Sequence, residues 1–472
     1  MDDRTPPLGR RLRDGAVLAA ACAFSAVTVL YAVLYAKVSS VDAVSDVCNS
    51  TDCPRGLGRL LLCTVVAWLV AAVLWVVAQR GRPRRSAALW TVAVVVALTA
   101  LWPAWYGFSW MRGPHMDLSG HQAPEGAGAG KPLGSWAGEP GSGRVVRVRE
   151  DGLTAYNGGG RRSWGRAAPE GTTVCAMGAD TPSGTGVLAY ATATGAGPCG
   201  TRIAAVDLTS GEERWSKDVP APTGTGTGTL SAGGSLAVSA TAGAVLAHDL
   251  REGTERWRAP LPTRPGAIVQ EVAAGPYRVL VTVRSDEGRE LLALDARTGA
   301  VAWRTPLPAE YPRIVSTVPA AVIANDRLLL FDDAGRPRGG GAEPPYVPAA
   351  TGQRRVVGDV LLVAVPEREK REVLEAYSLV DGRLLWTRAF EDDMWVRALG
   401  VGRTGRVEVV TQGAYTHLWH LDLRTGQPAG PSTVLRDLPM GESIAFHGRT
   451  FVNLDAGGRL PPVFDVAPAS GW

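Results

Sequence analysis

A hairpin pattern that recurs along the chain constrains its fold more than any other feature. In the copy that spans Leu292 to Trp303, an apolar run precedes Asp295, and Gly299 and Trp303 follow at offsets of four and eight. The apolar run is typical of a half-buried strand. Asp at the start of a turn accepts backbone N–H groups, and Gly adopts positive φ without a Cβ clash. The pattern therefore predicts a strand, a tight turn and a second strand that carries a large apolar plate.

Eight copies of this pattern follow one another between residue 156 and the C-terminus. They begin at Tyr156, Asp207, Asp249, Asp295, Phe331, Ser378, Asp422 and Leu454. Their mean spacing is about 43 residues, which matches the length of a four-stranded propeller blade. The copies at Phe331 and Leu454 are the most degenerate. The sequence therefore predicts an all-β, eight-bladed β-propeller, with seven blades as the alternative.

The copy from Ala205 to Trp215 resembles the repeat of pyrroloquinoline-quinone (PQQ) type β-propellers. The resemblance extends over about residues 144–472 and is strongest in three or four copies. In that family the Trp docks between adjacent blades. The resemblance implies this structural role for Trp164, Trp215, Trp257, Trp303 and Trp386. It is specific for the fold but not for the function, because one scaffold hosts many activities.

Three uncharged apolar stretches near the N-terminus, at residues 15–36, 60–79 and 86–110, are each long enough to cross a bilayer as a helix. The alternative for the first stretch is a cleaved signal peptide, but the stretch is longer than the usual apolar core of such a peptide. A stretch rich in Gly and Pro follows, which is typical of a flexible tether. The predicted domains are a membrane anchor of three transmembrane helices over 1–112, a linker over 113–143 and a propeller over 144–472.

Basic residues are concentrated in the anchor and predict its orientation. They form two groups outside the spans, Arg4, Arg10, Arg11 and Arg13, and then Arg80, Arg82, Arg84 and Arg85. Both groups are expected to stay in the cytoplasm. The N-terminus is then cytoplasmic and the propeller is extracytoplasmic. The net charge is +6 for residues 1–112 and −2 for the rest, which argues against nucleic acid as a partner of the propeller.

The six cysteines fit this topology. Cys22 and Cys63 lie inside predicted spans. The other four would face an oxidising compartment, so two disulfides are expected, Cys48–Cys53 and Cys175–Cys199. Zinc is the alternative for each pair, but neither pair has the two further ligands of a structural zinc site.

No catalytic, cofactor-binding or metal-binding residue is assigned from the sequence. PQQ dehydrogenases, which the repeat also resembles, hold PQQ beside a disulfide of adjacent cysteines and a calcium ion, and this chain has no adjacent cysteines. We therefore expect a non-catalytic scaffold in the membrane that requires no cofactor and binds a protein partner at a propeller rim or in the central funnel. Non-enzymatic members of the family, such as the lipoprotein of outer-membrane assembly machinery, act in this way. The alternatives are a PQQ- and calcium-dependent dehydrogenase and an extracellular ligand-sensing domain of a membrane complex.

Overall fold

The structure is a computed structural model. It contains two compact units, a helical unit and a propeller unit that holds most of the strands. It describes residues 8–41, 57–81, 87–112, 115–117, 130–138, 144–157, 161–192, 198–220, 227–261, 266–308, 312–338, 344–348, 353–368, 371–390, 394–401, 405–413, 416–430, 432–436, 444–447, 450–454 and 463–465.

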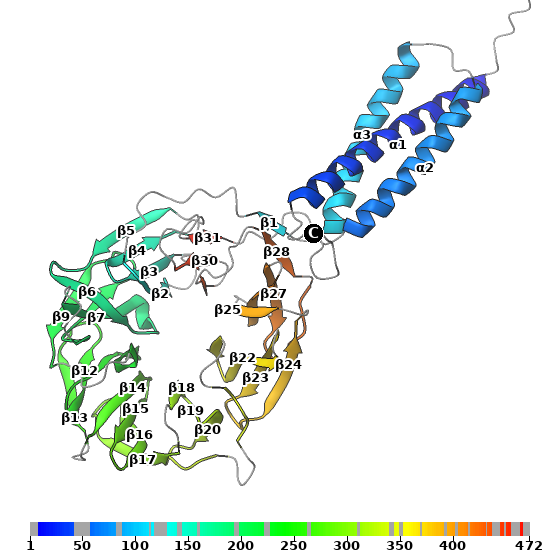
Figure 1. Ribbon diagram of the computed structural model, residues 1–472. Coiled ribbons are helices and arrows are strands. Elements are labelled where there is room, and N and C mark those ends of the chain that lie inside the picture. The colour runs from blue at the N-terminus through cyan, green and yellow to red at the C-terminus, as the bar shows by residue number, and fades with distance from the viewer. Residues whose placement is uncertain are drawn as a thin grey trace, which may run out of the picture. The chain divides into compact units, whose positions relative to one another are not determined.

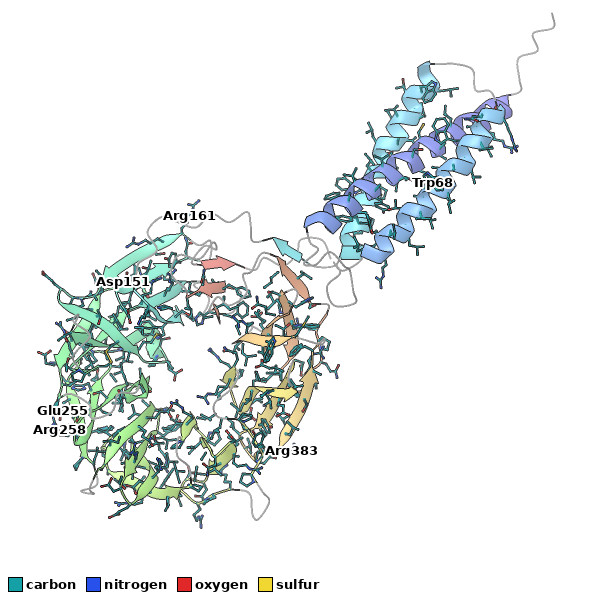
Figure 2. The ribbon with its side chains drawn as sticks, viewed as in Figure 1. Trp68, Asp151, Arg161, Glu255, Arg258 and Arg383 are labelled. Atoms are coloured by element: carbon teal, nitrogen blue, oxygen red, sulfur yellow. A yellow bond between two sulfur atoms is a disulfide. The ribbon has the colours of Figure 1, made fainter. Side chains whose placement is uncertain are left out.

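The helical unit contains α1 (Leu8–Val41), α2 (Leu57–Gly81) and α3 (Ala87–Arg112). Segments of these helices are long and apolar enough to cross a membrane, at Arg13–Ala36, Leu57–Arg80 and Leu89–Phe108. Helix α1 contacts both others, and polar groups pair between helices: Trp75 Nε1 donates to Ser25 Oγ at 3.0 Å. Apolar side chains such as Trp68, which is 59% exposed, point away from the other helices (Figure 2). An exposed apolar surface on a long helix is what a membrane span requires.

The propeller unit is built from antiparallel sheets of consecutive strands. The first four sheets contain β2 (Pro132–Ala137), β3 (Val145–Arg149), β4 (Gly152–Tyr156) and β5 (Arg162–Ala167); β6 (Thr172–Met177), β7 (Thr185–Thr192), β8 (Arg202–Asp207) and β9 (Glu213–Asp218); β10 (Leu230–Gly233), β11 (Leu236–Ala240), β12 (Ala244–Asp249) and β13 (Glu255–Pro260); and β14 (Ile268–Ala274), β15 (Arg278–Ser285), β16 (Gly288–Asp295) and β17 (Val301–Leu307).

The later sheets contain β18 (Arg313–Thr317), β19 (Ala320–Ala324) and β20 (Arg327–Phe331); β21 (Arg354–Val357), β22 (Val360–Arg368), β23 (Arg371–Ser378) and β24 (Leu384–Ala389); β25 (Trp395–Val401), β26 (Arg406–Gln412) and β27 (Thr416–Asp422); and β29 (Ile444–His447), β30 (Thr450–Asn453) and β31 (Val463–Asp465). Two further short strands are β1 (His115–Asp117) and β28 (Thr433–Arg436), and two single-turn 3₁₀ helices lie at Pro182–Gly184 and Thr227–Thr229.

These sheets stand in a ring, with the first strand of each sheet toward the centre and the last toward the outside (Figure 1). The middle strands are buried on both faces, as in β11 and β19, where all five residues are buried. The expectation of an all-β propeller after three apolar helices is therefore confirmed. Among the described residues seven sheets contain a strand of five or more residues, and the last, β29–β31, has strands of three or four. The count of eight blades stays a prediction.

The predicted tether is wrong in two parts, because residues 115–117 of the span 113–143 form β1 and residues 132–137 form β2, the innermost strand of the first sheet. β2 pairs with β3 along its length, with Trp136 opposite Val146. The Trp136 side chain is 1% exposed and its Nε1 donates to the carbonyl of Gly178 in the second sheet at 2.7 Å. The sequence did not predict this strand, because it contains only two large apolar residues and the residues around it are rich in Gly and Pro.

Two copies of the repeat are displaced by one residue from their expected start. The turn acceptor of the first copy is Asn157, whose Oδ1 accepts the Arg161 N–H, and not Tyr156. In the fifth copy it is Asp332, whose Oδ1 accepts the Ala334 and Arg336 N–H groups, and not Phe331. Tyr156 and Phe331 are instead the last residues of β4 and β20. The fixed offset of four fails here because these turns are one residue shorter.

Candidate functional site

The repeated Asp closes its own turn. Asp295 Oδ1 accepts the N–H groups of Arg297 and Thr298, each at 3.0 Å, and Gly299 has φ of 71°. Hydrogen bonds from the Thr298 side chain and backbone hold the pKa of Asp295 below its ordinary value. The same acceptor geometry occurs at Asp207, Asp249 and Asp422. These carboxylates are therefore committed to local structure and are poor candidates for catalytic bases.

The repeated Trp lies against the turn glycine of the next sheet along the chain. A Cβ at Gly299 would come within 2.6 Å of the Trp257 ring, so this position requires Gly both for its φ and for space. The pairs are Trp164 with Gly211, Trp215 with Gly253, Trp257 with Gly299, Trp303 with Gly335, and Trp386 with Gly426. Five contacts of one kind thus join neighbouring sheets.

An Ala stands opposite each of these tryptophans on the neighbouring strand. In the fourth sheet Ala293 pairs with Trp303, and a bulge follows between Ala293 and Leu294. The same register and bulge occur at Ala155 with Trp164, Ala205 with Trp215, Ala247 with Trp257, and Ala376 with Trp386. All five alanines are fully buried. A small residue opposite the ring leaves room for it, and the bulge twists the outer strand.

The indole nitrogens divide the tryptophans into two groups. Trp215, Trp257 and Trp386 donate Nε1–H to the carbonyls of Leu250, Ala296 and Leu423 in the next sheet, at 2.9 to 3.0 Å. For Trp164 and Trp303 no acceptor is found among the described residues. Three of the contacts therefore combine apolar packing with a buried hydrogen bond.

The first and last sheets meet at the inner strands. Ser135 Oγ on β2 and His447 Nε2 on β29 lie 2.8 Å apart. Further out, Val452 on β30 packs with Val145 and Tyr156. Burial, together with the positive charge of Arg355, lowers the pKa of His447 to about 4, so its imidazole is neutral at pH 7. The closure of the ring therefore rests on a neutral hydrogen bond and an apolar cluster.

A cavity of about 470 Å³ opens between the inner strands β2, β21, β25 and β29. Its charged or titratable lining consists of Arg354 and Arg355 on β21, Arg397 on β25 and His447 on β29. Apolar side chains, among them Phe446, line another part. None of the described residues that line it is Asp or Glu. The cavity is therefore a site with excess positive charge on rigid strands.

The described part of the chain holds no group of three or more His, Cys, Asp or Glu side chains that could bind a metal ion. The cavity presents guanidinium donors instead. Guanidinium groups have no acceptor and remain protonated, so they bind carboxylates and phosphates rather than cations. The arrangement suits recognition of an anion.

Comparison with known proteins agrees with the repeat geometry. Residues 137–243 and 200–341 match the family model described as outer membrane protein assembly factor BamB. These residues carry the PQQ-like propeller repeat. The match covers the Trp–Gly contacts from Trp164 to Gly335. The resemblance of Ala205–Trp215 led us to expect docking of the Trp between blades, but not its Gly partner. No relative is found among curated proteins.

The solved structures that match are distant in sequence. BamB from Moraxella catarrhalis is 15% identical with a TM-score of 0.41, and the alignment covers 70% of this chain and 96% of that one. The C-terminal WD40 domain of Sif2 is 9% identical with a TM-score of 0.49, covering 72% and 96%. A chain of the mitotic checkpoint complex is 11% identical with a TM-score of 0.38, covering 73% and 93%.

One expected disulfide is present in the propeller unit. Cys175 on β6 is bonded to Cys199, which precedes β8. Cys48 and Cys53 lie outside the described residues, so the second expected disulfide stays a prediction. Cys22 and Cys63 are free cysteines in the helices.

Sequence reasoning missed the arginines of the cavity. Arg354, Arg355 and Arg397 lie outside the repeated hairpin, on the first strand of their sheets, where the repeat has no fixed residue. The adjacent Arg354 and Arg355 at the start of a strand are the only local signal. Two adjacent arginines are equally compatible with a position in a cavity and with a position on the solvent-exposed surface. The cavity itself forms only when the sheets are arranged in the ring.

Proposed function

We propose that the chain is a membrane-tethered, eight-bladed PQQ-like propeller that acts as a non-catalytic binding scaffold for a protein partner. The observation that carries the proposal is the cavity between β2, β21, β25 and β29, which is lined by cationic side chains and by no described carboxylate. The turn aspartates, which are the commonest acids of the repeat, are held in hydrogen bonds. The matching family model is named for an assembly factor, which is in keeping with a scaffold. The eight sheets support eight blades.

We place the propeller on the extracytoplasmic side. The arginine groups around residues 4–13 and 80–85 favour a cytoplasmic N-terminus by the positive-inside rule. The Cys175–Cys199 disulfide favours an oxidising compartment for the propeller. The test is labelling of intact cells with a membrane-impermeant maleimide. Arg383→Cys, on the outer side of the ring (Figure 2), should react, and Arg82→Cys should react only after lysis; the reverse pattern would invert the topology.

Binding of a partner is tested by photocrosslinking in the native membrane with the full-length chain. Gln353 lines the cavity, so a photoreactive residue there should give one discrete protein adduct in intact cells. A photoreactive residue at Arg383, which is 74% exposed at its side chain, is the matched control and should not give that adduct. Identical adducts from both positions, or none from Gln353 in the presence of all cell proteins, would contradict a partner at the cavity.

The second candidate function is a PQQ- and calcium-dependent dehydrogenase, which the repeat itself favours. It is separated from the scaffold by adding PQQ and calcium to the purified full-length protein. Quinone that remains bound after gel filtration, with a saturable rise in melting temperature, would replace the scaffold by the enzyme. A sensor of a membrane complex would instead bind a small ligand without a protein adduct at Gln353.

A further inference from the structure

The first strands of the sheets, which lie toward the centre of the ring, carry more basic than acidic side chains. In the described chain, the first strands of the sheets from β2 to β29 contain four arginines, Arg313, Arg354, Arg355 and Arg397, and one carboxylate, Glu271. Arg354, Arg355 and Arg397 line the cavity. Because the side chains come from two neighbouring sheets, they present guanidinium groups to one space from different directions. Charges of one sign on low-dielectric walls focus the field within such a space.

Each arginine of the cavity has a carboxylate within electrostatic reach, Glu271 for Arg354, Asp180 for Arg355 and Glu372 for Arg397. Two of these carboxylates also have structural tasks. Glu271 on β14 accepts the Ile314 N–H of β18 at 2.9 Å, and burial raises its pKa. Glu372 on β23 accepts the Val396 N–H of β25 at 2.8 Å, and burial raises its pKa too. Each therefore links two sheets through a backbone donor, and neither lines the cavity. The three carboxylates reduce the positive potential, and none of them lines the cavity.

Arg355 is exposed, and its charge acts on His447 and on Asp180. It lowers the pKa of His447, after the larger effect of burial. His447 is held by Ser135 at 2.8 Å and stays neutral. The cavity lining therefore combines guanidinium groups with the apolar surface of Phe446 and Leu399. A ligand that suits it carries several anionic groups on a short carbon frame.

We propose that this cavity binds a polycarboxylate, either a small di- or tricarboxylic acid or the acidic side chains of a partner segment, through Arg354, Arg355 and Arg397. Planar guanidinium groups pair with carboxylates in a bidentate manner. A volume of about 470 Å³ lies in the range of small-ligand pockets. The inference rests on the proposed binding function and specifies the chemistry of its ligand.

The test is isothermal titration of the full-length protein in detergent with two probes, citrate and hexaglutamate. We expect saturable binding of at least one probe that weakens as salt is added, because the pairs are charged and partly exposed. The double variant Arg355→Gln with Arg397→Gln should bind that probe at least about tenfold more weakly. Arg383→Gln removes one positive charge on the outer side of the ring (Figure 2) and should leave the affinity unchanged.

The two probes identify the source of the carboxylates. Tighter binding of citrate indicates a small acid and, if Gln353 also gives no protein adduct, it favours the sensor over the scaffold. Tighter binding of hexaglutamate indicates an acidic segment of a protein partner. Absence of binding by both probes would overturn the inference, and so would equal affinity of the double variant and the native chain, since the anion would then bind elsewhere. An adduct from Gln353 that persists while both probes fail would leave the scaffold in place and remove only the polycarboxylate. The Cys175–Cys199 bond and the melting temperature of each variant check that it is folded.

Discussion

Ser135 and His447, which are 312 residues apart in the sequence, lie 2.8 Å apart between Oγ and Nε2 and join the first sheet of the ring to the last. The two strands that carry them, β2 and β29, also border the cavity. Ring closure and the candidate site therefore share two residues, Ser135 and His447, of which only His447 titrates. A change in its protonation acts on both.

His447 should make stability fall between about pH 6.5 and pH 4. Its pKa is about 4 in the folded chain, below the ordinary value of about 6.5 in the unfolded chain. The unfolded state therefore takes up the proton first as the pH falls, and the loss reaches at most about 3 kcal/mol. Thermal unfolding across this range measures it. His447→Gln should remove this part of the pH dependence, and Arg355→Gln should reduce it by raising the pKa of His447; unchanged slopes in both would contradict the assignment.

Gly299 should be more costly to replace than a turn glycine without a neighbouring ring. Gly299→Ala meets both a positive φ of 71° and the Trp257 ring at 2.6 Å. Gly358 has φ of 61° with nothing within 4 Å of an added Cβ. Gly358→Ala should therefore cost about 1 kcal/mol for backbone strain alone. Gly299→Ala should cost about 1–3 kcal/mol more because the ring must move. Equal losses in chemical unfolding would show that the ring contact has no energetic role.

Trp257 should contribute through its ring and its indole N–H together. Trp257→Ala and Trp303→Ala should each cost roughly 3–5 kcal/mol, because each opens a cavity between two sheets. The milder Trp257→Phe should cost about 1 kcal/mol more than Trp303→Phe. Of these two tryptophans, Trp257 donates its indole N–H to the carbonyl of Ala296, whereas no acceptor for Trp303 is found among the described residues. Trp395, which is 43% exposed, is the control, and Trp395→Ala should change the melting temperature little. Native-like melting of Trp257→Ala would refute the docking role.

The Cys175–Cys199 disulfide should stabilise the propeller by restricting the unfolded chain. The two cysteines are 24 residues apart in the sequence, and a loop of that length corresponds to about 3 kcal/mol. The double variant Cys175→Ser with Cys199→Ser should melt at a lower temperature than the native chain. Reductant should lower the melting temperature of the native chain toward that of the variant and leave the variant unchanged. Equal melting with and without reductant would show that the bond has no stabilising effect.

Local chemistry made much of the fold predictable. Asp295, Gly299 and Trp303 lie within one hairpin, and hydrogen bonding inside the turn, positive φ and apolar burial are decided by neighbours in the sequence. The fixed spacing of the copies then predicted a propeller, and uninterrupted apolar stretches predicted the three helices. The same reasoning erred at Tyr156 and Phe331, where a turn shorter by one residue shifts the acceptor, and at β2, whose strand has few apolar residues.

The sequence by itself determined the repeat, the turns, the apolar helices and which residue types face the core, because each depends on interactions within a few residues. Only the tertiary structure decided which Trp meets which Gly, that Ser135 faces His447, and that Arg354, Arg355 and Arg397 share a cavity. These relationships join residues from different sheets, and the sheets meet only when the chain has closed its ring. The spacing of the repeats does not predict which residues of the inner strands meet, because those strands lie outside the repeated hairpin.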